Sequence, residues 1–106
     1  MMSEKILKQL PKLKESLSKQ PIIKAWLFGS YARGEETSSS DIDLLVEYDN
    51  DAKVSLFTVG HISYVLSQEL GCDVDLIEDG CLYDFAKQSA ENDKILIYER
   101  GDKRQG

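Results

Sequence analysis

The chain has few of the residues that mark a disulfide-rich, zinc-binding or membrane protein. Among its 106 residues are two cysteines, two prolines and one histidine. The two cysteines, Cys72 and Cys81, do not have the spacing of a zinc knuckle, so we expect reduced, partly buried thiols. No apolar run approaches the roughly 20 residues that a membrane-crossing helix needs. These absences leave an ordinary globular protein with one hydrophobic core.

Basic residues are also scarce. Thirteen Lys and Arg face nineteen Asp and Glu, which gives a formal net charge of −6. A protein that grips DNA or RNA usually needs a basic face to displace counterions from phosphates, so we expect no direct nucleic-acid grip. A nucleotide whose phosphates are neutralised by a metal is not excluded. The N-terminus lacks the apolar core of a signal peptide, which predicts a cytoplasmic protein without membrane contact.

Hydrophobic periodicity predicts helices that alternate with strands. Helices are expected over 3–19, 31–34, 55–70 and 81–90, and strands over 22–28, 42–48, 73–77 and 94–98. Pro11 interrupts the first helix and predicts either a kink or a second helix that begins near it. Trp26, Phe28 and Phe57 are expected in the core. This order predicts an α/β (α+β) fold of about four strands with helices mainly on one face, one domain over 1–100 and a flexible tail over 101–106.

Two aspartates flank an isoleucine at the start of the second predicted strand. Because a strand alternates its side chains, Asp41 and Asp43 should project from one face while Ile42 enters the core. Neighbouring carboxylates repel each other and are costly to desolvate, and Mg²⁺, which prefers oxygen ligands, would relieve that cost. Taken alone, the motif is also compatible with two acidic residues on an exposed edge strand.

A second feature lies directly after the first predicted strand. Ten residues separate Ser30 from Asp41. Gly29 would let the backbone approach a ligand closely, while the Ser30 hydroxyl and the amides of the following helix start suit phosphate oxygens. Arg33 adds a fork of donors that also suits phosphate. Singly these are a common turn and a common surface arginine, but together they predict phosphate donors and metal carboxylates at the ends of adjacent strands.

These two segments, GSYARG at 29–34 and SDIDLLV at 40–46, resemble the signature of the polymerase-beta-like nucleotidyltransferases. The resemblance is closest to the minimal nucleotidyltransferase branch of that superfamily. It implies a nucleotidyltransferase fold, a short mixed sheet with helices packed on it. The implied nucleotide-binding residues are Gly29, Ser30, Arg33 and Ser40, and the implied metal ligands include Asp41 and Asp43.

Members of the superfamily use a third carboxylate on a neighbouring strand. Asp73 and Asp75 have the same strand parity, so alternation cannot choose between them. The family pattern, an acidic residue followed directly by apolar ones, selects Asp75. The alternative is that both are solvated surface residues. The resemblance therefore implies a catalytic set of Asp41, Asp43 and Asp75 that holds two Mg²⁺ ions, with ATP as the substrate.

No segment of the chain resembles an acceptor-binding domain. Similar stand-alone proteins act as antitoxins, transferring AMP from ATP to a tyrosine of a partner HEPN-domain ribonuclease and silencing it. The resemblance implies this function and a hetero-oligomer with the HEPN toxin. Two alternatives stay open: transfer to a small molecule or to the protein itself, and a non-catalytic antitoxin that neutralises by binding alone.

Overall fold

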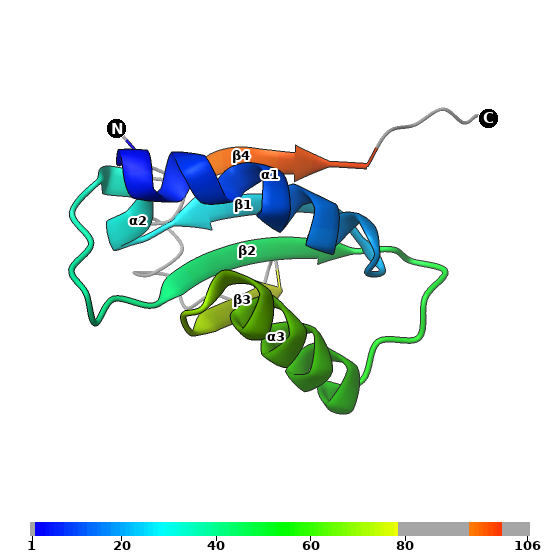
Figure 1. Cartoon of the computed structure of the whole chain (residues 1–106). Coiled ribbons are helices and arrows are strands. Elements are labelled where there is room, and N and C mark those ends of the chain that lie inside the picture. The colour runs from blue at the N-terminus through cyan, green and yellow to red at the C-terminus, as the bar shows by residue number, and fades with distance from the viewer. Residues whose placement is uncertain (1, 79–93, 101–106) are drawn as a thin grey trace, which may run out of the picture.

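The structure is a computed structural model that describes residues 2–78 and 94–100. Along the chain (Figure 1) it contains α1 (Glu4–Ser18), β1 (Ile22–Phe28), α2 (Ser30–Arg33), β2 (Ile42–Tyr48), α3 (Leu56–Leu70), β3 (Val74–Glu78) and β4 (Ile95–Glu99). The strands form one sheet in the order β3-β2-β1-β4. Strand β1 is antiparallel to both β2 and β4, while β2 and β3 are parallel. The predicted mixed sheet of four strands is therefore confirmed.

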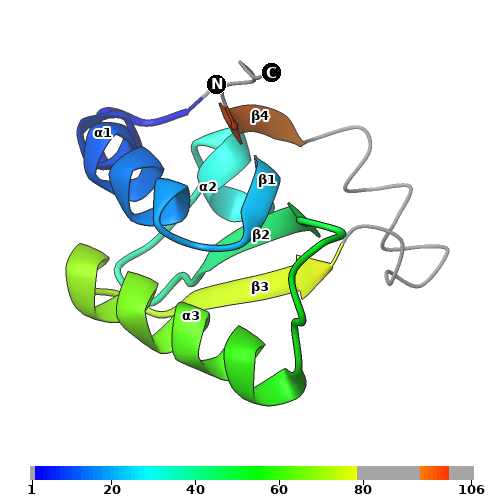
Figure 2. The ribbon, with the colours of Figure 1, turned by 90° about the vertical axis from the view of Figure 1, so that its right-hand side faces the viewer.

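Helices α1 and α3 contact each other and pack against one face of the sheet, as Figure 2 shows. Strand alternation sends every second apolar side chain of β1 and β2 toward these helices. The resulting core is one cluster, whose fully buried members include Ile6, Leu13, Leu17, Ala25, Leu27, Ile42, Leu44, Val46, Ile62 and Leu66. The opposite face of the sheet carries Asp43, whose neighbours on β2 point to the helices.

Helix α1 runs unbroken through its proline. Ser3 caps the helix by accepting a hydrogen bond from the backbone N–H of Ile6. Pro11 lies inside the helix, so the prediction of a second helix starting there is wrong. The apolar face continues across the proline because Ile6, Leu13 and Leu17 are all fully buried, and this packing offsets the lost backbone hydrogen bond.

The aromatic residues predicted for the core lie elsewhere. Phe57 is 90% exposed, because the buried face of α3 is set by Ile62 and Leu66 and Phe57 projects away from it. Trp26 and Phe28 are partly buried, since they alternate with residues that face the helices. The core prediction was wrong for these three side chains.

The remaining boundaries differ little from expectation. Strands β3 and β4 each begin one residue later than predicted. Cys72 is a free, half-buried thiol, as expected. Cys81, the predicted helix at 81–90 and the predicted tail at 101–106 lie outside the described residues. Within the described part of the chain, no helix is long and apolar enough to cross a membrane.

Candidate nucleotide-transfer site

The site is built around the turn that follows β1. Gly29 has a φ of 77°, a backbone conformation that favours glycine, and it caps the short helix α2. Its carbonyl accepts hydrogen bonds from the backbone N–H groups of Ala32 and Arg33. This turn leaves the amides of Ser30 and Tyr31 as first-turn donors without a partner within α2. The predicted phosphate-binding segment therefore forms a strand–turn–helix junction.

Gly29 lies against the carboxylate of Asp43. A Cβ atom placed on Gly29 would be 2.6 Å from Oδ2 of Asp43, closer than real Cβ contacts allow. The contact follows from the antiparallel register of β1 and β2, which pairs Phe28 with Asp43. Glycine is thus favoured here by its backbone conformation, and any Cβ at this position would force the Asp43 carboxylate to shift.

The third carboxylate faces Asp43 from the other side. In the parallel ladder between β2 and β3, Asp43 pairs with Asp75. Asp73 precedes the first residue of β3, and its carbonyl accepts a hydrogen bond from the N–H of Ile42. Of the two candidates left by the sequence, Asp75 is therefore the one placed directly beside Asp43. Its catalytic role stays a prediction.

Asp43 is in an environment that disfavours its charge. Burial raises the pKa of Asp43 from 3.8 to about 6, and repulsion from Asp75 and then Asp41 acts in the same direction. Attraction from the Arg33 guanidinium opposes the increase in pKa. Asp41 itself is exposed and directly precedes β2. The three predicted metal ligands thus interact electrostatically, with Asp43 at the centre.

The other two predicted nucleotide-binding residues have structural contacts of their own. Arg33 is an exposed side chain whose Nε lies 2.9 Å from Oε1 of Glu35. Ser40 closes a turn, because its Oγ accepts a hydrogen bond of 2.9 Å from the N–H of Thr37. A phosphate that binds Arg33 would compete with Glu35, a contact that no sequence pattern indicated. The binding roles of Arg33 and Ser40 stay predictions.

The three carboxylates have the right chemistry for a divalent cation, but their oxygens are not gathered around one point. Among residues 2–78 and 94–100, no three His, Cys, Asp or Glu side chains are gathered closely enough to form a finished metal site. The donor set nevertheless fits, because Asp41, Asp43 and Asp75 supply the hard oxygen ligands that Mg²⁺ prefers. Their mutual repulsion at Asp43 is the cost that a dication would remove. Ligation of one ion by all three would require the side chains to converge further.

The aromatic side chains of β1 lie on the same face as Asp43. The ammonium of Lys94 is 4.8 Å from the centroid of the Trp26 ring, within the range of a cation–π contact. Trp26 pairs with Leu45 in the register with β2, one alternation from the Phe28–Asp43 pair. Strand alternation alone could have predicted that Trp26 and Phe28 share one face of β1, and their pairing with β2 places them on the face of Asp43.

Comparison with known proteins decides the family. The nucleotidyltransferase domain family matches residues 10–97. The chain belongs to this family. A Methanocaldococcus jannaschii protein named as a protein adenylyltransferase is 42% identical over 72 residues, which cover 67% of this chain and 72% of the relative. A second protein of that organism with the same name is 38% identical over 79% of this chain and 85% of its own length.

Solved structures show the same nucleotidyltransferase fold. A minimal nucleotidyltransferase has a TM-score of 0.72 at 24% identity, covering 90% of this chain and 95% of that one. A toxin–antitoxin structure with AMP-PNP has a TM-score of 0.64 at 23% identity, covering 91% and 72%. A tri-AMPylated Shewanella oneidensis HEPN toxin in complex with its MNT antitoxin gives 0.66 at 19% identity, covering 89% and 72%. These structures and this chain therefore share the nucleotidyltransferase fold.

Proposed function

We propose that the protein is an antitoxin that transfers AMP from ATP to a tyrosine hydroxyl of a HEPN-domain ribonuclease partner. The observation that carries the proposal is the placement of Asp43, which lies against Gly29 on one strand and faces Asp75 on the other. Relatives named as protein adenylyltransferases support AMP transfer to a protein. Fold similarity to antitoxins of HEPN toxins supports the class of partner.

We assign Asp41, Asp43 and Asp75 as the residues that hold Mg²⁺, with two ions expected. The bound ions would supply charge neutralisation of the triphosphate and acidification of the acceptor hydroxyl. Asp43 sits at the centre of the repulsion within this set, so it should gain most from a bound cation. The assignment accounts for a half-buried carboxylate in the sheet that is repelled by Asp75 and Asp41.

The residues of the turn would position the nucleotide. Ser30 and the first amides of α2 would donate hydrogen bonds to phosphate oxygens. Arg33 would leave its ion pair with Glu35 and balance the negative charge of the phosphates. The tyrosine oxygen then attacks the α-phosphorus, forming the new P–O bond as the bond to the bridging oxygen breaks and pyrophosphate leaves. The hydroxyl proton passes to a carboxylate, for which Asp75 is the candidate because it lies at the edge of the sheet.

A protein acceptor is favoured over a small molecule by the surface of α3. Leu56 and Phe57 are 89% and 90% exposed, and Tyr64, two helical turns after Phe57 on the same face, is 63% exposed. Adjacent exposed apolar side chains of this size are typical of surfaces that contact another protein. These side chains are where we expect the partner of the proposed hetero-oligomer to bind.

The proposal is tested by incubating the protein with ATP, Mg²⁺ and a purified HEPN partner and measuring intact masses. We expect the partner to gain one or more AMP units, and the Asp41→Ala, Asp43→Ala double variant to give no gain. Asp73→Ala is the matched control and should retain transfer. AMP addition by the double variant would refute the catalytic assignment. AMP found on this chain instead would support self-modification, and toxin neutralisation by the double variant would support a non-catalytic antitoxin.

A further inference from the structure

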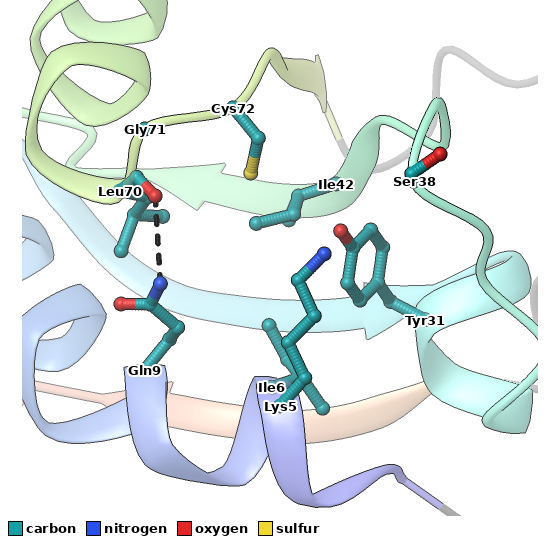
Figure 3. Close-up of a pocket in the computed structure, with 9 residues that line it drawn as sticks. All are labelled: Lys5, Ile6, Gln9, Tyr31, Ser38, Ile42, Leu70, Gly71 and Cys72. Carbon is teal, nitrogen blue, oxygen red and sulfur yellow. Dashed lines mark hydrogen bonds between the residues drawn. The ribbon is translucent and has the colours of Figure 1, made fainter.

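A cavity of about 120 Å³ lies on the helix-covered side of the sheet. Figure 3 shows it between α1, α2, the start of β2 and the turn from α3 into β3. Its aliphatic walls are Ile6, Ile42 and Leu70. Its volume corresponds to about four water molecules at liquid density, well below the roughly 300 Å³ at which pockets for drug-sized ligands begin. A nucleotide is therefore too large for it.

The cavity is separate from the carboxylate site. Ile42 lines the cavity and alternates along β2 with Asp41 and Asp43, so those carboxylates project from the opposite face. Tyr31 lines it from α2, one residue after Ser30. The two sites share elements of the fold, but the sheet lies between them.

Tyr31 is a core residue whose hydroxyl reaches the cavity. The residue is only 2% exposed. In Figure 3 its hydroxyl points toward Ile42 and the end of the Lys5 side chain, into the cavity. Among the described residues, no side chain or backbone group forms a hydrogen bond with this hydroxyl. The Tyr31 hydroxyl is therefore open to an acceptor that enters the cavity.

The other polar groups at the cavity are also donors or are already engaged. Lys5 places its ammonium 5.8 Å from the centroid of the Tyr31 ring, and within the described residues it forms no ion pair. The thiol of Cys72 points inward, whereas the Ser38 hydroxyl points away in Figure 3. Gln9 donates its amide N–H to the carbonyl of Leu70 at 3.4 Å. Figure 3 thus shows the end of the Lys5 side chain and the Tyr31 hydroxyl at one end of the cavity, next to the aliphatic side chain of Ile42.

The Glu36 carboxylate also attracts Lys5. It accepts a hydrogen bond from Ser3, and this bond, with a smaller attraction from Lys5, lowers the pKa of Glu36. Glu36 does not line the cavity. Lys5 therefore remains available to an acceptor that enters.

We propose that this cavity binds a short aliphatic carboxylate, whose anionic head meets Lys5 and the Tyr31 hydroxyl while its alkyl part contacts Ile6, Ile42 and Leu70. A charged acceptor gains from a charge-assisted contact with Lys5, which is exposed, and from the hydroxyl donor of Tyr31. The aliphatic walls add a contribution that a compact inorganic anion cannot obtain. The ligand is limited to about four to six non-hydrogen atoms by the cavity volume.

The test uses Cys72 as a reporter in a Cys81→Ser chain, where it is the only thiol. The rate of Cys72 alkylation by N-ethylmaleimide is measured with sodium propionate, propionamide or inorganic phosphate at equal ionic strength. We expect propionate to slow alkylation saturably, at least fivefold, and the other two to have little effect. Equal protection by propionamide would show that no anion is recognised, and equal protection by phosphate would show that the aliphatic walls contribute nothing. Either result, or no protection by propionate, would overturn the proposal.

Variants then identify the donors. Tyr31→Phe and Lys5→Gln should each raise the propionate concentration for half-protection about tenfold, whereas Lys8→Gln, an exposed lysine of α1 outside the cavity, should not. Tyr31→Phe should keep the wild-type Tm because its hydroxyl forms no hydrogen bond. If it unfolds, Lys5→Gln still decides the matter. Unchanged half-protection in Lys5→Gln would overturn the proposal.

The cavity test does not depend on AMP transfer. Protection by propionate should persist in Asp43→Ala, and it should persist when ATP and Mg²⁺ are present at saturating concentration. If ATP displaces propionate, the cavity belongs to the nucleotide site and the proposal is wrong. If propionate protects but no AMP is transferred, only the proposed function fails.

Discussion

Replacing Asp43 by asparagine should stabilise the metal-free protein while abolishing nucleotide transfer. The pKa of Asp43 is raised from 3.8 to about 6, chiefly by burial and then by Asp75 and Asp41. A raised carboxyl pKa means that the folded state holds its proton more tightly than the unfolded state. At neutral pH the charged form is therefore a net cost to folding, which the amide removes.

The size and sign of this effect follow from the pKa values. A shift of about two units corresponds to about 3 kcal/mol, and screening by solvent at the half-exposed Asp43 reduces it to about 1–2 kcal/mol. Below about pH 3.8 both states are protonated and the cost is absent. It develops as pH rises from 3.8 to 6 and is complete above pH 6. Asp43→Asn should thus raise Tm by roughly 5–10 °C at pH 7 and change it little at pH 3.5.

The assay is thermal or urea unfolding of both proteins at pH 3.5 and pH 7, in EDTA and in Mg²⁺. Asp73→Asn is the matched control, because Asp73 is exposed and precedes β3, and its Tm should change little. Mg²⁺ should stabilise the wild type and have a smaller effect on Asp43→Asn, since the cation relieves the same repulsion. A variant that is less stable than the wild type at pH 7 in EDTA would refute the reasoning.

Three further changes probe the backbone and the surface. Gly29→Ala should lower the free energy of unfolding by about 1–3 kcal/mol and slow AMP transfer, because alanine is strained at this φ and its Cβ meets Asp43. Urea unfolding tests the loss of stability, and the transfer rate tests the loss of activity. A variant as stable as the wild type would contradict the contact between this Cβ and Asp43. Pro11→Ala should raise the free energy of unfolding, measured in urea, by about 1–2 kcal/mol, because the helix regains a backbone hydrogen bond at an exposed position. An unchanged free energy of unfolding would mean that α1 is bent in a way that suits proline. Arg100→Gln should cost no more than about 1 kcal/mol, since its 2.6 Å ion pair with Asp49 is partly exposed, and the loss should shrink in high salt.

The fold was predictable where short-range patterns and packing agree. Strands β1 and β2 have the predicted bounds because a continuous apolar run and an alternating one leave little choice. Phe57 was misplaced because aromatic character was weighed without the helical phase set by Ile62 and Leu66. Pro11 left two readings open because local propensity cannot report the burial that holds one helix together across it.

The site was predictable in residue type but not in its contacts. Alternation placed Asp41 and Asp43 on one face, and the family pattern selected Asp75 over Asp73. The pairing of Asp75 with Asp43 could not be predicted, because the β2–β3 register depends on long-range contacts. The clearance between Gly29 and Asp43 and the Arg33–Glu35 pair depend on three-dimensional placement as well. The cavity beside Tyr31 had no signal in the sequence, because five separate segments form it.

The cost of the site bears on the choice between an enzyme and a pure binding protein. Burial and two other carboxylates make the charge of Asp43 costly, and a Cβ at Gly29 would displace its carboxylate. A protein that neutralised a toxin by contact alone would gain stability from asparagine at this position and lose nothing in binding. The proposed enzyme cannot make that change, because its metal would lose a carboxylate ligand. Asp43→Asn therefore separates the two functions: a variant that is more stable but no longer neutralises the toxin requires catalysis, and one that is more stable and still neutralises it requires only binding.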